Sequence, residues 1–238
     1  MDEFVQLWVY LSSTPLFGLT ATLVTYVVAQ LCYERVGRAP WANPVLWSVL
    51  AIGTVLVATG TAYPVYFAGA QFIHVLLGPA VVALAWPLWV RRAEVRRRGA
   101  ALTIAALAGG AAAAGSAVLA ATWLGLPLDV VRSLAPKSVT APVAMGIAER
   151  IGGVPALAAV FAVLTGMVGA LSAKYLFDGL GVSSWAVRGF ALGTTSHGIG
   201  AARAIQVHED AGAYAGIALG LQVLLMSILM PLVVRWLA

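Results

Sequence analysis

The sequence has 238 residues, of which 61% are hydrophobic and only 10% are charged, and its mean hydropathy is +0.94. A soluble globular domain has roughly 25% charged residues, so this composition excludes a soluble enzyme, a disordered protein and a nucleic-acid-binding module. The formal net charge is +5, but the arginines between Arg91 and Arg98 form a run beside apolar stretches, which is typical of a cytoplasmic membrane flank. The single cysteine, Cys32, excludes an internal disulfide framework, and the acidic N-terminal sequence lacks the pattern expected of a secretory signal peptide.

Eight stretches are apolar enough to be considered as membrane helices, which need about 20 mostly apolar residues. In chain order they are Leu7–Leu31, Val45–Tyr63, Tyr66–Val90, Ala100–Leu126, Pro127–Ala148, Val154–Phe177, Ala186–Ile205 and Gly212–Leu237. The third and fifth are unusual, because they contain prolines together with polar side chains. We therefore expect an all-α polytopic membrane protein with about seven or eight transmembrane or re-entrant segments.

The distribution of Lys and Arg predicts the orientation of these segments. The Arg91–Arg98 run and the loop with Arg35 and Arg38 are expected on the cytoplasmic side, which leaves the N-terminus outside. Beyond Leu126 two arrangements remain open. The fifth stretch either dips into the membrane and returns on the same side, which the positive charges favour, or it crosses fully and reverses the side of everything that follows.

Two proline-bracketed segments resemble each other, Leu77–Pro87 and Leu134–Pro142. Proline removes a backbone donor and clashes with the preceding turn, so we expect both segments to be broken or kinked. Paired broken segments in corresponding positions indicate a transporter site, although prolines and glycines are also simply common in membrane helices. Our interpretation is one domain, with an N-terminal helix and loop (1–42) and two repeat-like halves with proline-broken helices (43–126 and 127–238).

Lys137 lies inside an apolar stretch, where an ionisable side chain costs about 2.5–3.5 kcal/mol and persists only with a partner or a water-filled cavity. Ser138 and Thr140 follow it, and on a helix Ser133, Lys137 and Thr140 would share one face. An ammonium beside hydroxyl groups suits a small carboxylate. The alternatives are an interfacial lysine that extends to the headgroups and a Ser133–Lys137 nucleophile pair, for which the sequence contains no oxyanion-hole motif.

A second polar cluster, with three hydroxyl groups, a histidine and three glycines, lies between Gly193 and Arg203. The glycines permit close helix packing or a break. On an unbroken helix His197 and Arg203 would point roughly 120° apart, so they would share a site only if Gly198–Gly200 is irregular. His197 could relay a proton or donate to an anion. The alternative is a buried histidine that only bonds a neighbouring helix.

The order of these motifs resembles that of the LrgB/CidB family of bacterial membrane proteins. The resemblance is carried by Pro136–Met145, Gly152–Pro155, Arg188–Gly193, Ser196–Gly200 and Leu76–Ala80, and it covers roughly Asn43 to the C-terminus. Ala141 and Ala201 stand where the family often has threonine. The resemblance implies a holin-like or antiholin-like system that acts with a small LrgA/CidA-type membrane protein to control murein hydrolase activity and lysis. It also implies transport of small monocarboxylates, since relatives are described as moving pyruvate in bacteria and glycolate and glycerate in the plant plastid.

These observations favour a transporter of a small monocarboxylate, of the pyruvate, glycolate or glycerate class, in the bacterial cytoplasmic (inner) membrane. We expect no enzyme activity, no metal and no other cofactor. The expected partners are the carboxylate, the LrgA/CidA-type protein, the lipid bilayer and, in a homo-oligomer, further copies of the chain, but no nucleic acid. The candidate substrate-binding residues are Lys137, Ser138, Thr140, Thr194, Ser196, His197 and Arg203, and the candidate accessory residues are Ser133, His74, Asn43 and Tyr63. The competing hypotheses are a holin-like regulator without its own substrate and a Ser-Lys intramembrane hydrolase.

Overall fold

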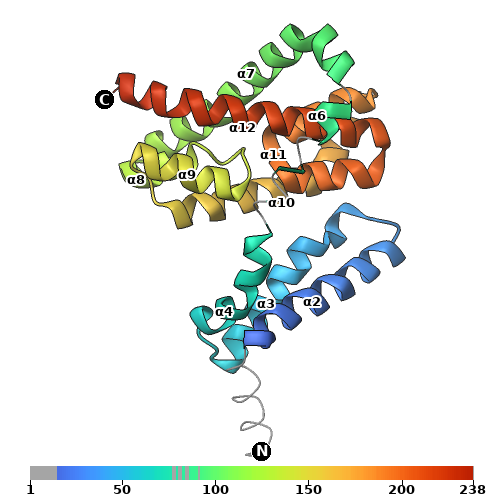
Figure 1. The fold of residues 1–238 in the computed structure, drawn as a ribbon, viewed down its shortest axis with the longest axis vertical. Coiled ribbons are helices and arrows are strands. Elements are labelled where there is room, and N and C mark those ends of the chain that lie inside the picture. The colour runs from blue at the N-terminus through green and yellow to red at the C-terminus, as the bar shows by residue number, and fades with distance from the viewer. Residues whose placement is uncertain (1–14, 77–78, 80–81, 84–85, 91, 238) are drawn as a thin grey trace, which may run out of the picture. The chain divides into compact units, whose positions relative to one another are not determined.

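The computed structural model describes residues 15–76, 79, 82–83, 86–90 and 92–237, and Figure 1 shows its fold. The described residues form helices and turns, with no strand among them, which confirms the all-α prediction. The chain divides into two compact units, Met1–Val81 and Val82–Ala238. The start of the predicted Leu7–Leu31 helix and most of the Leu77–Pro87 segment lie outside the described residues.

The first unit contains α2 (Pro15–Arg35), the short 3-10 helix η1 (Pro40–Ala42), α3 (Pro44–Thr59) and α4 (Tyr63–Val75). Helix α2 packs against both α3 and α4. Gly18 allows the close approach of α2 to α4, because a Cβ atom there would collide with the carbonyl oxygen of Tyr66, and Thr22 Oγ1 shares a 2.7 Å hydrogen bond with the Tyr66 hydroxyl. Since α4 ends at Val75, the predicted Tyr66–Val90 stretch is not one continuous helix.

The second unit holds the remaining helices. They are α6 (Trp86–Val90), α7 (Arg92–Trp123), α8 (Leu128–Leu134), α9 (Ala141–Ile151), α10 (Pro155–Gly179), α11 (Trp185–Val207) and α12 (Glu209–Leu237). Helix α7 begins at Arg92 rather than at the predicted Ala100, so most of the arginine run is helical. Arginine is a good helix former, and Glu94 and Arg98 lie 3.9 Å apart as an i,i+4 pair on this exposed end.

Four helices in the described part of the chain are long and apolar enough to cross a membrane. They are Leu16–Arg35, Arg92–Trp123, Pro155–Gly179 and Glu209–Arg235, and Pro44–Thr59 is a shorter apolar helix. Large apolar side chains on these helices point outward: Val168 is 63% exposed and Leu224 is 59% exposed. An outward-facing apolar surface of this kind suits lipid rather than water.

Small side chains fill the core of the second unit. The alanines that are fully buried there are Ala106, Ala144, Ala148, Ala158, Ala162, Ala215 and Ala218. Because alanine has a small side chain and glycine has none, they let the helix backbones approach closely, as in helices packed within a membrane. Two examples are Gly189 and Gly193 on α11, where a Cβ atom would collide with the backbone of α12.

Helix α8, the turns of residues 135–140 and α9 together form a helical hairpin, the first hairpin. Ser133 Oγ donates a 2.6 Å hydrogen bond to the carbonyl oxygen of Asp129 and accepts a 2.7 Å bond from the backbone N–H of Val154. Gly152, with a φ of 76°, ends α9 and lies against the Arg132 guanidinium. The residues that follow α9 therefore lie beside α8. The predicted fifth stretch therefore reverses direction within the fold.

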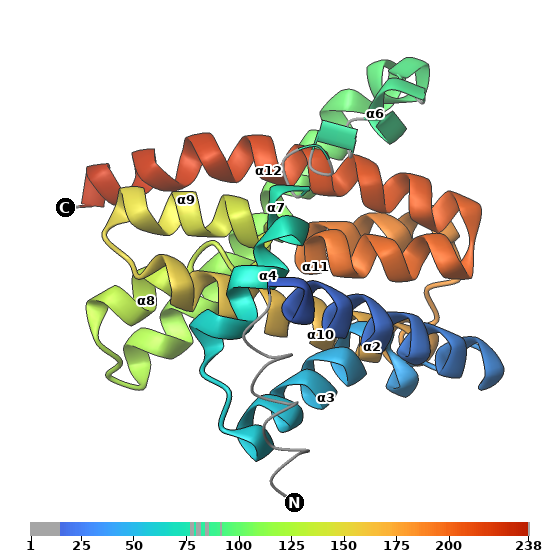
Figure 2. The same cartoon turned by 60° about the horizontal axis from the view of Figure 1, so that its bottom comes forward.

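Helix α11 is also a hairpin, the second hairpin. Its 23 residues are interrupted at His197, whose φ of 42° and ψ of −136° are not helical. A straight helix of this length would separate its ends by about 33 Å, at about 1.5 Å per residue. Instead the rings of Trp185, at its start, and His208, just after its end, stack with their centroids 5.0 Å apart. The two halves of α11 thus run back along each other, and Figure 2 shows α12 lying along α11 and α9.

Candidate functional site

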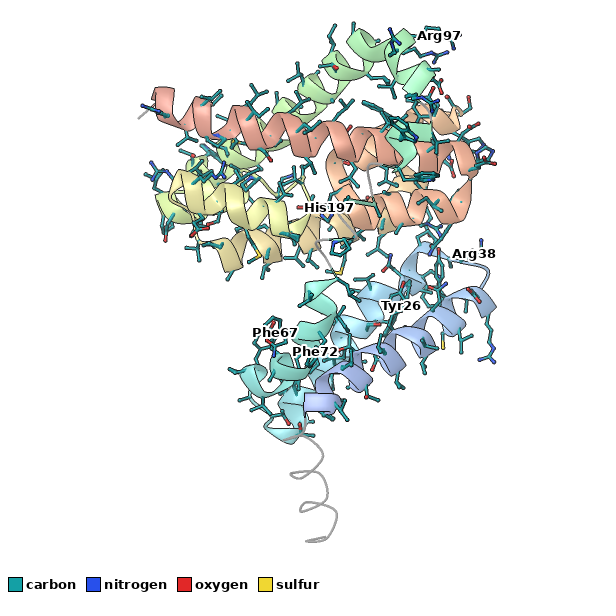
Figure 3. The ribbon with its side chains drawn as sticks, viewed as in Figure 1. Tyr26, Arg38, Phe67, Phe72, Arg97 and His197 are labelled. Carbon is teal, nitrogen blue, oxygen red and sulfur yellow. The ribbon has the colours of Figure 1, made fainter. Side chains whose placement is uncertain are left out.

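The tips of the two hairpins meet in the second unit. The first tip consists of residues 135–140, and the second tip consists of residues 196–198. A Cβ atom at Gly198 would lie 3.9 Å from the side-chain methyl carbon of Thr140. We call this meeting point the tip contact; it brings together the two polar segments that the sequence singled out. His197, which Figure 3 labels, lies within the helices of the second unit.

Two helices begin at the tip contact. Helix α9 starts at Ala141, directly after Thr140, and the second half of α11 starts at Gly198. The backbone N–H groups of a first helical turn have no partner within their own helix, and the helix dipole is positive at this end. Broken helices that present their N-termini at the same point are suited to an anionic group.

His197 fixes the second tip to α10. Its side chain is 3% exposed, and its Nε2 atom lies 2.7 Å from the carbonyl oxygen of Ala162. A carbonyl oxygen can only accept, so Nε2 carries a proton in this contact, and Nδ1 is the other ring nitrogen. Gly166 makes room for the ring, because a Cβ atom there would lie 2.8 Å from His197 Cε1. This contact anchors His197, and it is the bond to a neighbouring helix that the sequence left as an alternative.

Ser138 and Thr140 are buried hydroxyl residues at the first tip, with 3% and 7% of their surfaces exposed. Neither hydroxyl has a hydrogen-bond partner among the described residues. Thr140 is the N-cap residue of α9, but its side chain makes no capping hydrogen bond. Because buried polar groups in folded proteins are nearly always hydrogen-bonded, two orphan hydroxyls on one tip indicate a place where a ligand or water binds.

Lys137 lies between Pro136 and Ser138 in the first tip and is partly buried. Within the described chain its ammonium forms no ion pair with a carboxylate. Its position supplies a positive charge on the same six-residue turn as the two orphan hydroxyls.

The other candidates from the second polar cluster occupy different surroundings. Thr194 Oγ1 donates to the carbonyl oxygen of Phe190 at 2.8 Å, and its methyl group lies against Gly109 of α7. Ser196 is buried against Gly169 of α10, with its hydroxyl 3.3 Å from that of Thr195. Arg203 lines a pocket between α10, α11 and α12.

The structure shows the surroundings of three of the four accessory candidates. The hydroxyl of Ser133 closes the first hairpin, as described above. Asn43 caps α3, since its Oδ1 accepts from the backbone N–H groups of Val45 and Leu46 at 2.9 and 3.2 Å. Tyr63 is 62% exposed at the start of α4. Asn43 and Tyr63 belong to the first unit, and the side chain of His74 lies outside those that the structure describes.

Several residues in these surroundings were not predicted. Gly166 and Gly169 on α10 leave room for the side chains of His197 and Ser196. No sequence signal distinguishes these two glycines from the many other small residues of this chain. Gln222 on α12 is fully buried, and its Nε2 donates a 2.6 Å bond to the carbonyl oxygen of Ala106. A single amide within the apolar Gly212–Leu237 stretch is the signal that could have found it. Among the described residues, no group of three His, Cys, Asp or Glu side chains is placed to hold a metal ion.

Comparison with known proteins gives a consistent family assignment. The model of the LrgB-like family matches residues 22–236. The chain is 33% identical to the uncharacterized protein YxaC of Bacillus subtilis, over 91% of this chain and 93% of that protein. It is 29% identical to the holin-like protein CidB of Staphylococcus epidermidis, over 98% of each chain. No solved structure matches the chain. The resemblance read from the Pro136–Met145 and Ser196–Gly200 motifs is confirmed, and the chain belongs to the LrgB-like family.

Proposed function

We propose that this protein carries a small monocarboxylate, of the pyruvate, glycolate or glycerate class, across the bacterial cytoplasmic membrane, and that the tip contact is its binding site. The observation that carries the proposal is the pair of buried hydroxyls on Ser138 and Thr140 that lack partners among the described residues. A carboxylate oxygen is an acceptor that could satisfy both of them. Hydrogen bonds to a charged group contribute about 1.5–3 kcal/mol each, more than bonds between neutral groups.

The remaining groups at the tip contact have complementary roles. Lys137 supplies a positive charge, and the two helix N-termini at Ala141 and Gly198 add partial positive charge from backbone N–H groups. His197 positions the second tip through Ala162, and its Nδ1 atom can accept a hydrogen bond from a substrate hydroxyl. Thr194 and Ser196 position the first half of α11, which ends at His197.

The two hairpins also provide a means of alternating access. Each hairpin precedes a long apolar helix, α10 or α12. We propose that these two hairpin–helix pairs are related to each other; both lie within the predicted second half (127–238), so this pairing differs from the predicted division into 43–126 and 127–238. Unwound backbone at membrane depth is tolerated only where it is buried in protein or lines a wet cavity, so hairpin tips that meet there would form the site around which the two pairs move. In this arrangement seven or eight segments enter the membrane, and two of them are re-entrant.

The test is uptake of labelled pyruvate and glycolate into proteoliposomes that contain only the purified protein. Uptake should saturate, and Lys137→Ala should lower it at least tenfold. Ser138→Ala should weaken apparent affinity by about tenfold or more, the loss expected for one charge-assisted hydrogen bond. Ser172→Ala is the matched control, because Ser172 is exposed on α10 and bonds only its own helix. If the Lys137→Ala variant takes up substrate as fast as the wild type, Lys137 does not have the role proposed for it.

A second candidate function is a holin-like regulator of murein hydrolase activity that works with a small LrgA/CidA-type membrane protein and has no substrate of its own. The CidB relatives are named holin-like proteins, which favours it. It predicts that the purified protein, as a monomer or homo-oligomer in lipid, produces no saturable carboxylate flux. It also predicts that leakage appears only when the partner is present, so the same proteoliposomes separate the two functions.

A further inference from the structure

An apolar groove runs along the second unit between α7, α8 and α12. It has a volume of about 590 Å³, and its longest walls are residues 106–118 of α7 and residues 222–234 of α12. A stretch of this length extends an α-helix by about 18 Å, so the groove is about that long. The hydrocarbon core of a membrane is about 30 Å thick. The groove is therefore a little longer than one lipid leaflet is thick.

The surface of this groove is apolar along its length. From α12 it is lined by leucine, methionine and valine side chains, which are Leu225, Met226, Leu229, Met230, Val233 and Val234. Gln222 is fully buried and its Nε2 atom bonds the carbonyl oxygen of Ala106, so its amide adds no exposed polar surface. Gly115 lies in the α7 wall, where an added Cβ atom would meet nothing within 4 Å. The groove thus has room for a flexible apolar chain.

Arg132 on α8 is the charged side chain in the lining of the groove. Its guanidinium lies against Gly152 at the end of α9, and within the described residues it forms neither an ion pair nor a hydrogen bond. The carboxylates of the first hairpin, Asp129 and Glu149, are exposed and do not pair with it. The guanidinium has five N–H donors, which remain available for an anionic group.

The position of Arg132 along the chain sets its depth in the membrane. Trp123 ends α7 and is 88% exposed, and exposed tryptophans are typical of the membrane interface. Helix α8 begins soon afterwards, at Leu128, and Arg132 lies about 6 Å along its axis. Because an arginine side chain is long and flexible, its guanidinium reaches the headgroups from this depth.

We propose that the groove binds an anionic phospholipid, with one acyl chain between α7 and α12 and the phosphate against Arg132. The apolar walls suit a hydrocarbon chain, and guanidinium N–H groups match phosphate oxygens in charge and in geometry. Basic pockets between transmembrane helices bind anionic headgroups in this way. The length of the groove favours this occupant, because a partner helix that crosses the membrane would need a groove about 30 Å long. The site is independent of transport at the tip contact, because it uses neither the orphan hydroxyls nor His197.

The test is native mass spectrometry of the full-length protein in detergent micelles, titrated with phosphatidylglycerol or with phosphatidylcholine that has the same acyl chains. Phosphatidylcholine carries no net charge, so the comparison of the two lipids isolates the headgroup contact. Arg132→Gln removes the cation, and Gly115→Leu fills the groove. The matched controls are Arg97→Gln, on the exposed end of α7 that Figure 3 labels, and Gly53→Leu, at an exposed position of α3 where an added Cβ atom meets nothing within 4 Å.

We expect the wild type to bind phosphatidylglycerol about tenfold more tightly than phosphatidylcholine, as one charge-assisted contact would give. Arg132→Gln should bring the ratio of the two affinities close to one. Gly115→Leu should weaken the binding of both lipids about tenfold, which corresponds to the loss of roughly two buried CH₂ groups. Both control variants should behave like the wild type.

Ala111→Leu adds a side chain to the same wall at an exposed position, and it replaces Gly115→Leu if that variant does not fold. The proposal is overturned if Arg132→Gln keeps the preference for phosphatidylglycerol, if Arg97→Gln loses that preference equally, or if filling the groove leaves lipid binding unchanged. A dimer that forms without lipid and that Gly115→Leu dissociates would also overturn it, because a second copy of the chain would then occupy the groove. None of these outcomes depends on whether the tip contact transports a carboxylate.

Discussion

Replacing Thr140 by valine should separate binding from stability. Valine has the size of threonine but puts a methyl group in place of the hydroxyl. The Thr140 hydroxyl is buried without a partner among the described residues, so water can bind it when no ligand is present. We therefore expect Thr140→Val to change the free energy of unfolding of the free protein by at most about 1 kcal/mol. With ligand, the same change removes a hydrogen bond to a carboxylate worth about 1.5–3 kcal/mol, which corresponds to roughly 10- to 150-fold weaker binding.

Two assays on the purified protein measure these two effects separately. Thermal unfolding without ligand reports stability, and calorimetry or uptake with glycolate reports affinity. Thr54→Val is the matched control, because Thr54 is exposed on α3 and its hydroxyl bonds only the carbonyl oxygen of Leu50. The control should change affinity by less than twofold. If the Thr140→Val variant is destabilised by more than about 2 kcal/mol without ligand, or if it binds glycolate as tightly as the wild type, the hydroxyl has another role and the site is misassigned.

Three further predictions concern the hairpins. Gly166→Ala should destabilise the protein by about 1–3 kcal/mol and reduce uptake, because the added Cβ would lie only 2.8 Å from the His197 ring. The control is Gly146→Ala on α9, where an added Cβ would lie in open space, and this variant should be about 0.5–1 kcal/mol more stable than the wild type. Equal thermal shifts for the two variants would contradict the contact between Gly166 and the His197 ring. Ser133→Ala should cost about 1–3 kcal/mol by leaving the N–H of Val154 unpaired, and labelling of wild-type Ser133 by an active-site serine probe would support the hydrolase hypothesis instead. Cysteines at Trp185 and His208, in a Cys32→Ser background, should form a disulfide rapidly on mild oxidation, whereas a straight α11 would keep them too far apart to react.

The sequence predicted the helical class, the family and the polar segments of the tip contact, because these depend on composition and on local motifs. It did not predict that α11 folds back, since that depends on the contact of Trp185 with His208 and on a positive φ at His197 itself, whereas the sequence pointed to Gly198–Gly200 only as a place where a break was permitted. Local propensity offers no reason for a histidine to adopt this backbone conformation.

The sequence patterns also did not predict which polar side chains have hydrogen-bond partners within the fold. Ser133 lies four residues before Lys137, and Ser138 follows it directly. The hydroxyl of Ser133 makes two hydrogen bonds within the fold, whereas that of Ser138 has no partner among the described residues. Arg203 was predicted to share a site with His197 only if the helix between them is irregular. The fold places Arg203 in the lining of a pocket together with Lys174 and Arg188.

The central claim is that a carboxylate binds where the two hairpin tips meet. Its most direct test is an experimental structure of the protein in a nanodisc with saturating glycolate. The account predicts ligand density at the tip contact, within hydrogen-bond distance, about 2.5–3.0 Å, of the hydroxyls of Ser138 and Thr140. Glycolate density elsewhere with this contact empty, or hairpin tips that lie apart from each other, would contradict it.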